Sequence, residues 1–369
     1  MPVLAERPSR VAYAHGFLGH WSLPQVVPTI PFGQLMQSSS SCFTRAGRTL
    51  SPVAIACAGA CFFGSTVVRA EPSKLPPEVG YNYNEVETGR VAAKNGADRA
   101  LGSSVSALFE NPANMATSRV YHATALLQIW PEASRQSYGI AAVDSVGSSS
   151  RIAGGLGATW TRQDPDGVDR TSSDLRFAFA YPLSDKLFAG AGGRFLWMTE
   201  NGAGPLGPSF ASSGLEGQKI FKNFAFDLGL TLRPGGGFSF ALVGNNLNGA
   251  DTGYQPLTLG GGIGFVKDKF GIEADLVSDL VTWDKAKLRA MSGAELLLGD
   301  HAVVRGGYRY DEGAKSHSGS LGLGYIDKSF SADIGVRRVL VGDIATAVVL
   351  SFTYHVESTG LTPTPSETW

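Results

Sequence analysis

A period of two in the side chains, kept from residue 119 to residue 356, most limits how this chain of 369 residues can fold. In its last segment, every second residue from Ile344 to Val356 is apolar, aromatic or threonine, and the residues between are mostly small or polar. Successive side chains of a β-strand point to opposite faces, so the pattern predicts strands with one apolar face. We predict fourteen strands, at 119–130, 136–147, 151–161, 173–183, 186–199, 219–233, 237–245, 255–266, 269–282, 285–298, 301–311, 317–326, 329–338 and 344–356.

The predicted connections favour a membrane barrel over a soluble sandwich. Longer connections, such as 200–218 and 246–255, tend to alternate with tight turns, such as 184–185 and 299–300. Long loops at one rim and short turns at the other are typical of outer-membrane barrels, and the strands reach the roughly 9 to 11 residues needed to cross a bilayer. Closure would also leave no unpaired strand edge. We therefore predict an all-β fold, a fourteen-stranded antiparallel transmembrane β-barrel.

Aromatic residues fall near both ends of the predicted strands. With the first strand running outward, the outer rim receives Trp130, Trp160, Trp197, Tyr308 and Tyr310. The inner rim receives Tyr121, Tyr181, Tyr325, Phe330, Phe352 and Tyr354. Two such belts are expected where a barrel wall meets the two membrane surfaces.

Composition excludes other classes of protein. The formal net charge of -1 gives no global field that would attract nucleic acid. Charged residues make up 17% of the chain, below the roughly one quarter that is usual for soluble domains. The mean hydropathy is near zero, too polar for a helical membrane protein but compatible with a barrel wall that alternates.

Residues 45–70 have the pattern of a secretory signal peptide. Arg45 and Arg48 precede an apolar run that is too short for a membrane helix and ends in small residues at Ala70. Cleavage there would remove all three cysteines, Cys42, Cys57 and Cys61. A retained membrane anchor is the alternative. An exported β-barrel of this kind is expected in the outer membrane of a Gram-negative cell.

The two ends of the chain are expected to lie outside the barrel. Residues 1–44 show no sustained periodicity, and secretory signals usually begin at the initiating methionine, so this segment is interpreted as a mis-called or unstructured extension with Met36 as a plausible start. Residues 357–369 form a C-terminal tail, which leaves either Phe352–Val356 or Trp369 as the signal for the barrel-assembly machinery.

Residues 71–118 lie between the signal and the first strand, and they contain an interrupted helix. Ser103–Glu110 is predicted to be helical, and Asn111 can cap a further turn that has Pro112 at its first position, where a missing N–H does no harm. Irregular backbone at membrane depth must be buried in protein or line a wet cavity. The segment could be a plug inside the barrel or a periplasmic leader, and the residues alone leave both readings open.

The stretch GRVAAKNGADRALGSSVSALFENPANMA, residues 89–116, resembles the N-terminal segment of FadL-type outer-membrane transport proteins and of the related PorV-like proteins. The pieces FDLGLTLRPGGGFSFALVGNNLNG and VVRGGYRYDEG resemble strand pairs of the same group. The resemblance implies a fourteen-stranded barrel plugged by an N-terminal hatch, 71–118, that includes Asn111, Pro112, Ala113 and Asn114. It also implies long-chain fatty acids or other hydrophobic molecules as substrates.

Several side chains are predicted to point into the outer half of the barrel. They are Leu196, Met198, Phe221, Val277, Val281, Trp283, Arg305 and Arg309. Apolar surface with a few placed guanidinium groups suits an amphipathic carboxylate. The alternative is that these residues pack against the hatch or pair with Asp174, Asp311 and Glu273 in a structural charge lattice.

The predicted function is passive uptake of hydrophobic small molecules, such as long-chain fatty acids, through an outer-membrane channel. The alternative is a PorV-like barrel that docks secretion or surface-attachment machinery. We predict no enzyme activity, cofactor or metal, because His122, His301, His317 and His355 are scattered in the sequence and Asp164–Asp169 reads as an outer turn. The expected partners are the outer-membrane bilayer, a hydrophobic ligand and the barrel-assembly machinery, but not nucleic acid.

Overall fold

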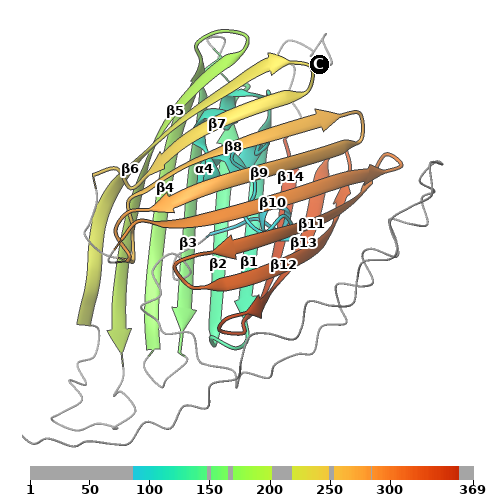
Figure 1. The fold of residues 1–369 in the computed structure, drawn as a ribbon. Coiled ribbons are helices and arrows are strands. Elements are labelled where there is room, and N and C mark those ends of the chain that lie inside the picture. The colour runs from blue at the N-terminus through green and yellow to red at the C-terminus, as the bar shows by residue number, and fades with distance from the viewer. Residues whose placement is uncertain are drawn as a thin grey trace, which may run out of the picture. The chain divides into compact units, whose positions relative to one another are not determined.

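The chain forms a closed barrel of fourteen antiparallel strands (Figure 1). The computed structural model describes residues 86–147, 151–164, 169–201, 218–248, 253–283 and 285–356. Each strand pairs with its neighbours in sequence, and β1 pairs with β14 to close the barrel. The strands are β1 Tyr121–Trp130, β2 Arg135–Asp144, β3 Ala153–Gln163, β4 Asp169–Pro182, β5 Leu187–Asn201, β6 Gln218–Gly235, β7 Phe238–Asn245, β8 Thr258–Lys267, β9 Phe270–Asp279, β10 Lys287–Leu298, β11 Ala302–Asp311, β12 Ser316–Ile326, β13 Phe330–Val341 and β14 Thr346–His355.

The predicted strands are confirmed, each overlapping one strand of the structure. The end that holds the β1–β2 turn and the long β5–β6 connection is called the outer end below, and the other is the inner end. The predicted extension 1–44, the signal peptide 45–70, the first part of the hatch (71–85) and the tail 357–369 lie outside the described residues. Among the described residues, no helix is both long enough and apolar enough to cross a membrane.

The outer surface of the barrel is apolar and its inner surface is largely small or polar. On β2, Ile140 is 69% exposed whereas its neighbour Ala141 is buried, and on β7 Leu242 is 67% exposed whereas Val243 is buried. Large exposed aliphatic or aromatic side chains on every strand would be unfavourable in water. They fit a wall that faces lipid, so the barrel is transmembrane.

The two aromatic belts are present, with one error in the prediction. Trp160, Trp197 and Tyr308 point outward near the outer end, as expected. Trp130 does not: it is 5% exposed and points into the lumen. The even-numbered residues of β1 face inward, and Trp130 shares that parity, so its ring packs in the lumen against the guanidinium group of Arg337, 5.1 Å from the ring centre.

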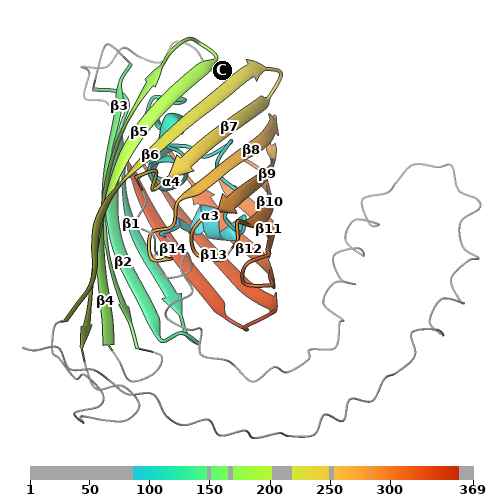
Figure 2. The ribbon, with the colours of Figure 1, turned by 60° about the vertical axis from the view of Figure 1, so that its left-hand side comes forward.

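The segment before β1 lies inside the barrel (Figure 2). It contains two short helices, α3 Gly89–Ala93 and α4 Ser104–Glu110, and a 3₁₀ helix, η2 Pro112–Ala116. The predicted helix is confirmed within one residue, and so is the predicted cap: the side chain of Asn111 accepts a hydrogen bond from Ala113 N at 3.1 Å, with Pro112 at the first position of η2. Because this segment lies in the lumen, it is a plug and not a periplasmic leader. We call residues 86–118 the hatch.

Glycines in the wall allow the hatch to approach the strands closely. A Cβ atom on Gly190 of β5 would overlap the backbone of Ala113, and one on Gly229 of β6 would overlap the side-chain oxygen of Asn111. The backbone of η2 therefore lies directly on two strands where no side chain stands between them. This contact fixes the position of η2 in the lumen.

Candidate functional site

Two buried carboxylates of β9 hold the middle of the hatch. Oxygens of Glu273 and Asp275 accept four hydrogen bonds, of 2.5 to 3.1 Å, from the backbone N–H groups of residues 98–101. Hydrogen bonds to ionised acceptors are about twice as strong as neutral ones. The sequence analysis considered Glu273 only as a member of a charge lattice and did not single out Asp275, because the alternation of β9 shows that they face inward but not what they face.

A group of four charged side chains joins α3 to the inner half of the wall. Arg90 of α3 pairs with Glu295 of β10 at 2.9 Å. Arg305 of β11 pairs with the same Glu295 at 3.1 Å and with Asp333 of β13 at 2.6 Å. The group contains two positive and two negative charges. The structure therefore places Arg305, which was predicted to contact a ligand in the outer half of the barrel, in an ion-paired group in the inner half. Its partners are Glu295 and Asp333 and not the carboxylates that the charge-lattice alternative named.

The carboxylates named in that alternative are also paired, but with other partners. The pairs are Asp174 with Arg176 (3.2 Å) and Arg194 (2.7 Å), Asp311 with Arg289 (3.2 Å), and Glu273 with Lys94 (3.3 Å). Only Lys94 belongs to the hatch, and it also pairs with Asp98. The other pairs lie within or between strands of the wall, where each buried charge needs a partner.

The start of the described hatch is held by two arginines of the wall. Glu87 Oε1 lies 2.7 Å from Arg337 and 3.3 Å from Arg309. The Nε atom of Arg309 also donates a hydrogen bond to the carbonyl oxygen of Asn95 at 3.0 Å. Arg309, the second predicted ligand cation, therefore contacts the hatch at two points.

The Asn-Pro-Ala-Asn element is bound to the wall through one threonine. The Nδ2 atom of Asn111 donates to Thr231 Oγ1 at 2.9 Å, and Thr231 Oγ1 donates to Asn114 Oδ1 at 2.7 Å. Both asparagine amides also donate to the carbonyl oxygen of Arg99 at 2.8 Å. All these side-chain amides are buried, and each offers both a donor and an acceptor, which aspartate could not do when ionised.

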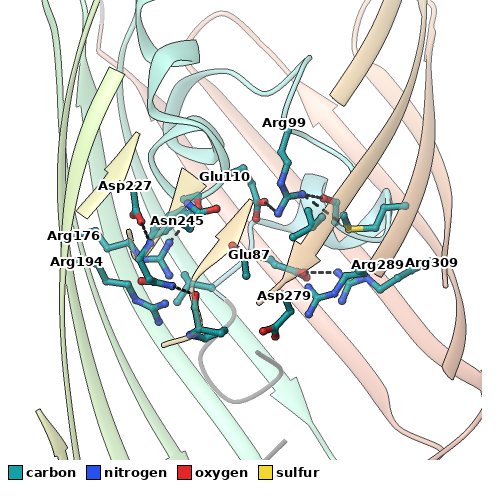
Figure 3. A pocket seen from close by; sticks show the side chains of 18 of the residues that line it. Glu87, Arg99, Glu110, Arg176, Arg194, Asp227, Asn245, Asp279, Arg289 and Arg309 are labelled. Atoms are coloured by element: carbon teal, nitrogen blue, oxygen red, sulfur yellow. Dashed lines mark hydrogen bonds and ion pairs between the residues drawn. The ribbon is translucent and has the colours of Figure 1, made fainter. Parts of the chain in front are cut away.

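A pocket lies in the lumen beside the hatch (Figure 3). Its volume is about 110 Å³, and we call it the outer pocket. Figure 3 shows Arg176 and Arg194 on one side of it and Arg289 and Arg309 on the opposite side. Its charged lining residues are Glu87, Arg99, Glu110, Arg176, Arg194, Asp227, Asp279, Lys287, Arg289 and Arg309. It is small and highly charged compared with the mostly apolar pockets that hold drug-sized ligands.

The apolar residues predicted to contact a ligand separate into different places. Leu196 and Met198 are buried against Phe221 and Tyr254, between β5 and β6. Val277 packs elsewhere, against Ala97 of the hatch and Met291 of β10, and it lines the outer pocket.

The remaining two predicted residues lie at the outer end. The backbone N–H of Val281 donates to Asp279 at 3.0 Å, and the indole of Trp283 lies against Gly313 in the β11–β12 turn. In the described part of the chain, the predicted set does not form one continuous apolar path from the outer end.

Two of the histidines are not scattered in space. His122 of β1 and His355 of β14 are register partners where the barrel closes, and their rings stack with centres 4.3 Å apart. Ser104, the first residue of α4, forms a hydrogen bond of 2.6 Å with Nδ1 of His122. The sequence analysis missed this pair because the residues are separated by almost the whole barrel. Among the described residues, no group of three or more histidine, cysteine, aspartate or glutamate side chains is placed to hold a metal ion.

The stacked histidines border a second cavity, at the inner end, which we call the inner cavity. Its volume is about 390 Å³, and it lies between α4 and the inner ends of β8 to β14 and β1. It is lined by Arg90, Arg305, Glu295 and Asp333 as well as by aliphatic and hydroxyl side chains. In the part of the chain that the structure describes, Glu87 borders the outer pocket and Arg90 borders the inner cavity, so the start of the hatch lies between these two spaces.

Several solved structures have a similar architecture. The monoaromatic hydrocarbon channel CymD superposes with a TM-score of 0.59 at 14% identity, over 74% of this chain and 99% of CymD. The toluene transporter TbuX of Ralstonia pickettii gives 0.55 at 17% identity, over 74% and 99%. A FadL homologue of Pseudomonas aeruginosa gives 0.50 at 13% identity, over 73% and 98%. The chain has the FadL-type fold.

The FadL-type fold confirms the resemblance seen in residues 89–116 at the level of architecture. No family model matches the sequence, and no curated protein matches it either. At identities of 12 to 17%, the likeness to the hydrocarbon channels is one of fold.

Proposed function

We propose that this protein is an outer-membrane channel for the uptake of small, largely hydrophobic molecules, and that the hatch closes it in the present structure. The observation that carries the proposal is a transmembrane barrel of FadL-type fold whose lumen is filled by a segment held through polar contacts. Solved proteins with this fold include channels named for monoaromatic hydrocarbons and toluene. We include long-chain fatty acids among the proposed substrates.

The contacts of the hatch suit a gate. Lys94 and Glu273 are buried and oppositely charged, as are Arg99 and Asp275, and the attraction within each pair offsets the cost of removing its charges from water. Such contacts stabilise the closed state only while every partner is present. A molecule that displaces one partner, or water that enters, weakens the whole group, so a closed and an open arrangement can differ by only a few kcal/mol.

A docking role is the second candidate, and one observation favours it. The lumen is crossed by ion pairs from Glu87 to Arg337 and from Arg90 to Glu295, which is what a barrel without a solute path would show. A docking barrel would also need exposed apolar surface on its outer loops. Residues 202–217 and 249–252 of those loops lie outside the described residues.

Uptake by whole cells tests the proposal. Gram-negative cells that lack their own FadL-type channels would express the full chain, and the entry of radiolabelled ethylbenzene and decanoate would be followed. We expect faster entry of at least one compound than in cells with an empty vector. Equal rates together with a stoichiometric protein partner in detergent-purified material would support the docking role instead.

A further inference from the structure

One wall of the inner cavity is aliphatic. Val266 of β8, Leu297 of β10, Val303 of β11 and Ile326 of β12 line it, together with Val105 of α4. Val266 is 42% exposed and Ile326 is 37% exposed, although both line a cavity inside the barrel. A water-filled barrel mouth would favour polar side chains at these positions. Exposed aliphatic side chains gathered around one concave space indicate an apolar ligand.

The adjoining wall of the cavity, on β13, β14 and β1, is built from hydrogen-bonding groups. The stacked rings of His122 and His355 lie there, beside the hydroxyl groups of Ser104, Ser331 and Thr353. Ser104 occupies Nδ1 of His122, and His355 contacts Ser331 Oγ at 3.3 Å. Within the described residues, Nε2 of His122 has no hydrogen-bond partner. This side of the cavity can therefore donate or accept a hydrogen bond from a ligand.

The charges around the cavity are balanced. Arg90 and Arg305 are paired with Glu295 and Asp333, which leaves no net charge in that group. Lys269 at the rim is bonded to Gly299 O and Asp300. A neutral ligand fits such a lining. An anionic ligand would have to compete with the carboxylates that already pair with the two arginines.

From this lining we infer that the inner cavity binds a small neutral molecule with an apolar body and one hydroxyl end, such as an alkylphenol or an alcohol. The body would lie against Val266, Leu297 and Ile326, and the hydroxyl against His122 and His355. At about 390 Å³ the cavity is within the usual range for small-molecule sites. The inference deepens the proposed function and rests on it. A molecule in the inner cavity would have passed the hatch and would be held there before its release at the inner end.

Binding to the purified full-chain barrel in lipid nanodiscs tests the inference with two ligands that differ by one group. Titration calorimetry would compare 4-ethylphenol with ethylbenzene. We expect the phenol to bind at least tenfold more tightly, because a site built to hydrogen-bond a hydroxyl rejects the analogue that lacks it. Equal affinities, or no binding of either, would overturn the inference.

Variants locate the site. The double change His122→Phe and His355→Phe keeps two stacked rings but removes their nitrogens, and it should bring the two ligands to within about twofold of each other. Val266→Asn should weaken both ligands about fivefold. The matched control is Val339→Asn, at an inward-facing valine near the outer end of β13 that packs beside Trp130, and it should change neither affinity more than twofold.

A measurement on the unaltered protein covers the case in which a variant does not fold. Magnetisation transfer from bound 4-ethylphenol should reach ring protons of His122 and His355 and methyl protons of Ile326. Transfer only to Tyr254 and Met291, which line the outer pocket, would overturn the inference. Binding is measured at equilibrium on the purified protein, so it does not depend on uptake by cells. A negative uptake assay would contradict the proposed function but not the binding site, and a negative binding assay would contradict the binding site but not uptake.

Discussion

At the residue scale, the hatch is held by polar atoms that have few alternatives. The amides of Asn111 and Asn114 and the hydroxyl of Thr231 are all buried, so each lost partner leaves a group that water cannot reach. Leaving a buried polar group unsatisfied costs about 1–3 kcal/mol, more than an average hydrogen bond contributes. Single substitutions of near-equal shape can therefore test the hatch contacts one at a time.

Thr231→Val should loosen η2 without disturbing the barrel. The change keeps the shape of the side chain but removes the hydroxyl that bonds both asparagines, and we expect a loss of about 1–3 kcal/mol in local stability. Amide hydrogen exchange of residues 107–116 should speed up by about one to two orders of magnitude. Thr159→Val is the control, because Thr159 is buried and faces inward on β3 but its hydroxyl forms no hydrogen bond within the described chain. Equal exchange in both variants would contradict the role of Thr231.

Glu273→Gln should loosen the middle of the hatch. The amide keeps the size of the carboxylate but removes the charge that Lys94 and the N–H groups of Ala100 and Leu101 meet. We expect faster exchange at residues 98–101 and little change at residues 111–116. Asp300→Asn on the exposed β10–β11 turn is the control, since its partner Lys269 is itself exposed. Unchanged exchange at 98–101 would show that the charge of Glu273 does not hold this segment.

At the element scale, the close approach of η2 to β5 and β6 depends on glycine. Gly229→Ala places a methyl group where the side-chain oxygen of Asn111 lies, so η2 must shift or the strand must bend. We expect a destabilisation of about 1–3 kcal/mol, measured as a lower melting temperature in detergent. Gly306→Ala on β11, where a Cβ would meet only ordinary contacts, should be close to neutral. Equal melting temperatures for the two variants would contradict the packing described here.

The β1–β2 turn gives a pH dependence outside the membrane-spanning strands. Burial alone would raise the pKa of Glu132, but hydrogen bonds from the backbone and hydroxyl of Thr346 outweigh it and hold the pKa below its usual range. The ionised carboxylate is therefore favoured in the folded state, so its contribution is complete above the ordinary glutamate pKa and is lost as the pH falls. Melting temperatures at pH 7 and pH 3.5 should differ less in Glu132→Gln than in the unaltered protein. An equal difference in both proteins would contradict this role.

The sequence predicts the strands of the barrel better than it predicts the contacts of the hatch. A strand with one lipid face has a period of two, which needs no knowledge of its neighbours, and all fourteen strands follow from it. The same period fixed the inward face of Leu196, Val277 and Arg309. Trp130 was missed because an aromatic residue near a rim can face either side, and here the lumen supplies Arg337 as its partner.

Partners across the lumen could not be predicted from the chain alone. Asp275 and the backbone of Arg99 are 176 positions apart, and they meet only because the hatch turns back through a barrel of particular register. The His122–His355 pair depends in the same way on closure between the first and the last strand. Capping of η2 by Asn111 was predictable, because its partner lies two residues away.

At the scale of the whole molecule, the barrel, the hatch and the two lumenal spaces form a closed channel. The outer pocket and the inner cavity lie on different sides of the start of the hatch, and we expect passage between them to need the contacts of Arg90, Lys94 and Asn95 with the wall to open. Asn95 Oδ1 accepts a hydrogen bond from the Ser318 hydroxyl of β12 at 3.0 Å, so a disulfide between these two positions would tie the hatch to the wall.

The central claim is that solutes enter through the lumen when the hatch moves, and the double variant Asn95→Cys and Ser318→Cys tests it most directly. Uptake of labelled ethylbenzene and decanoate would be measured in the same cells under oxidising and reducing conditions, with the unaltered chain as control. The account predicts that uptake by the variant falls to the empty-vector rate when oxidised and recovers on reduction, while the control is unaffected. Uptake that is the same in the oxidised and reduced variant would contradict passage through the lumen.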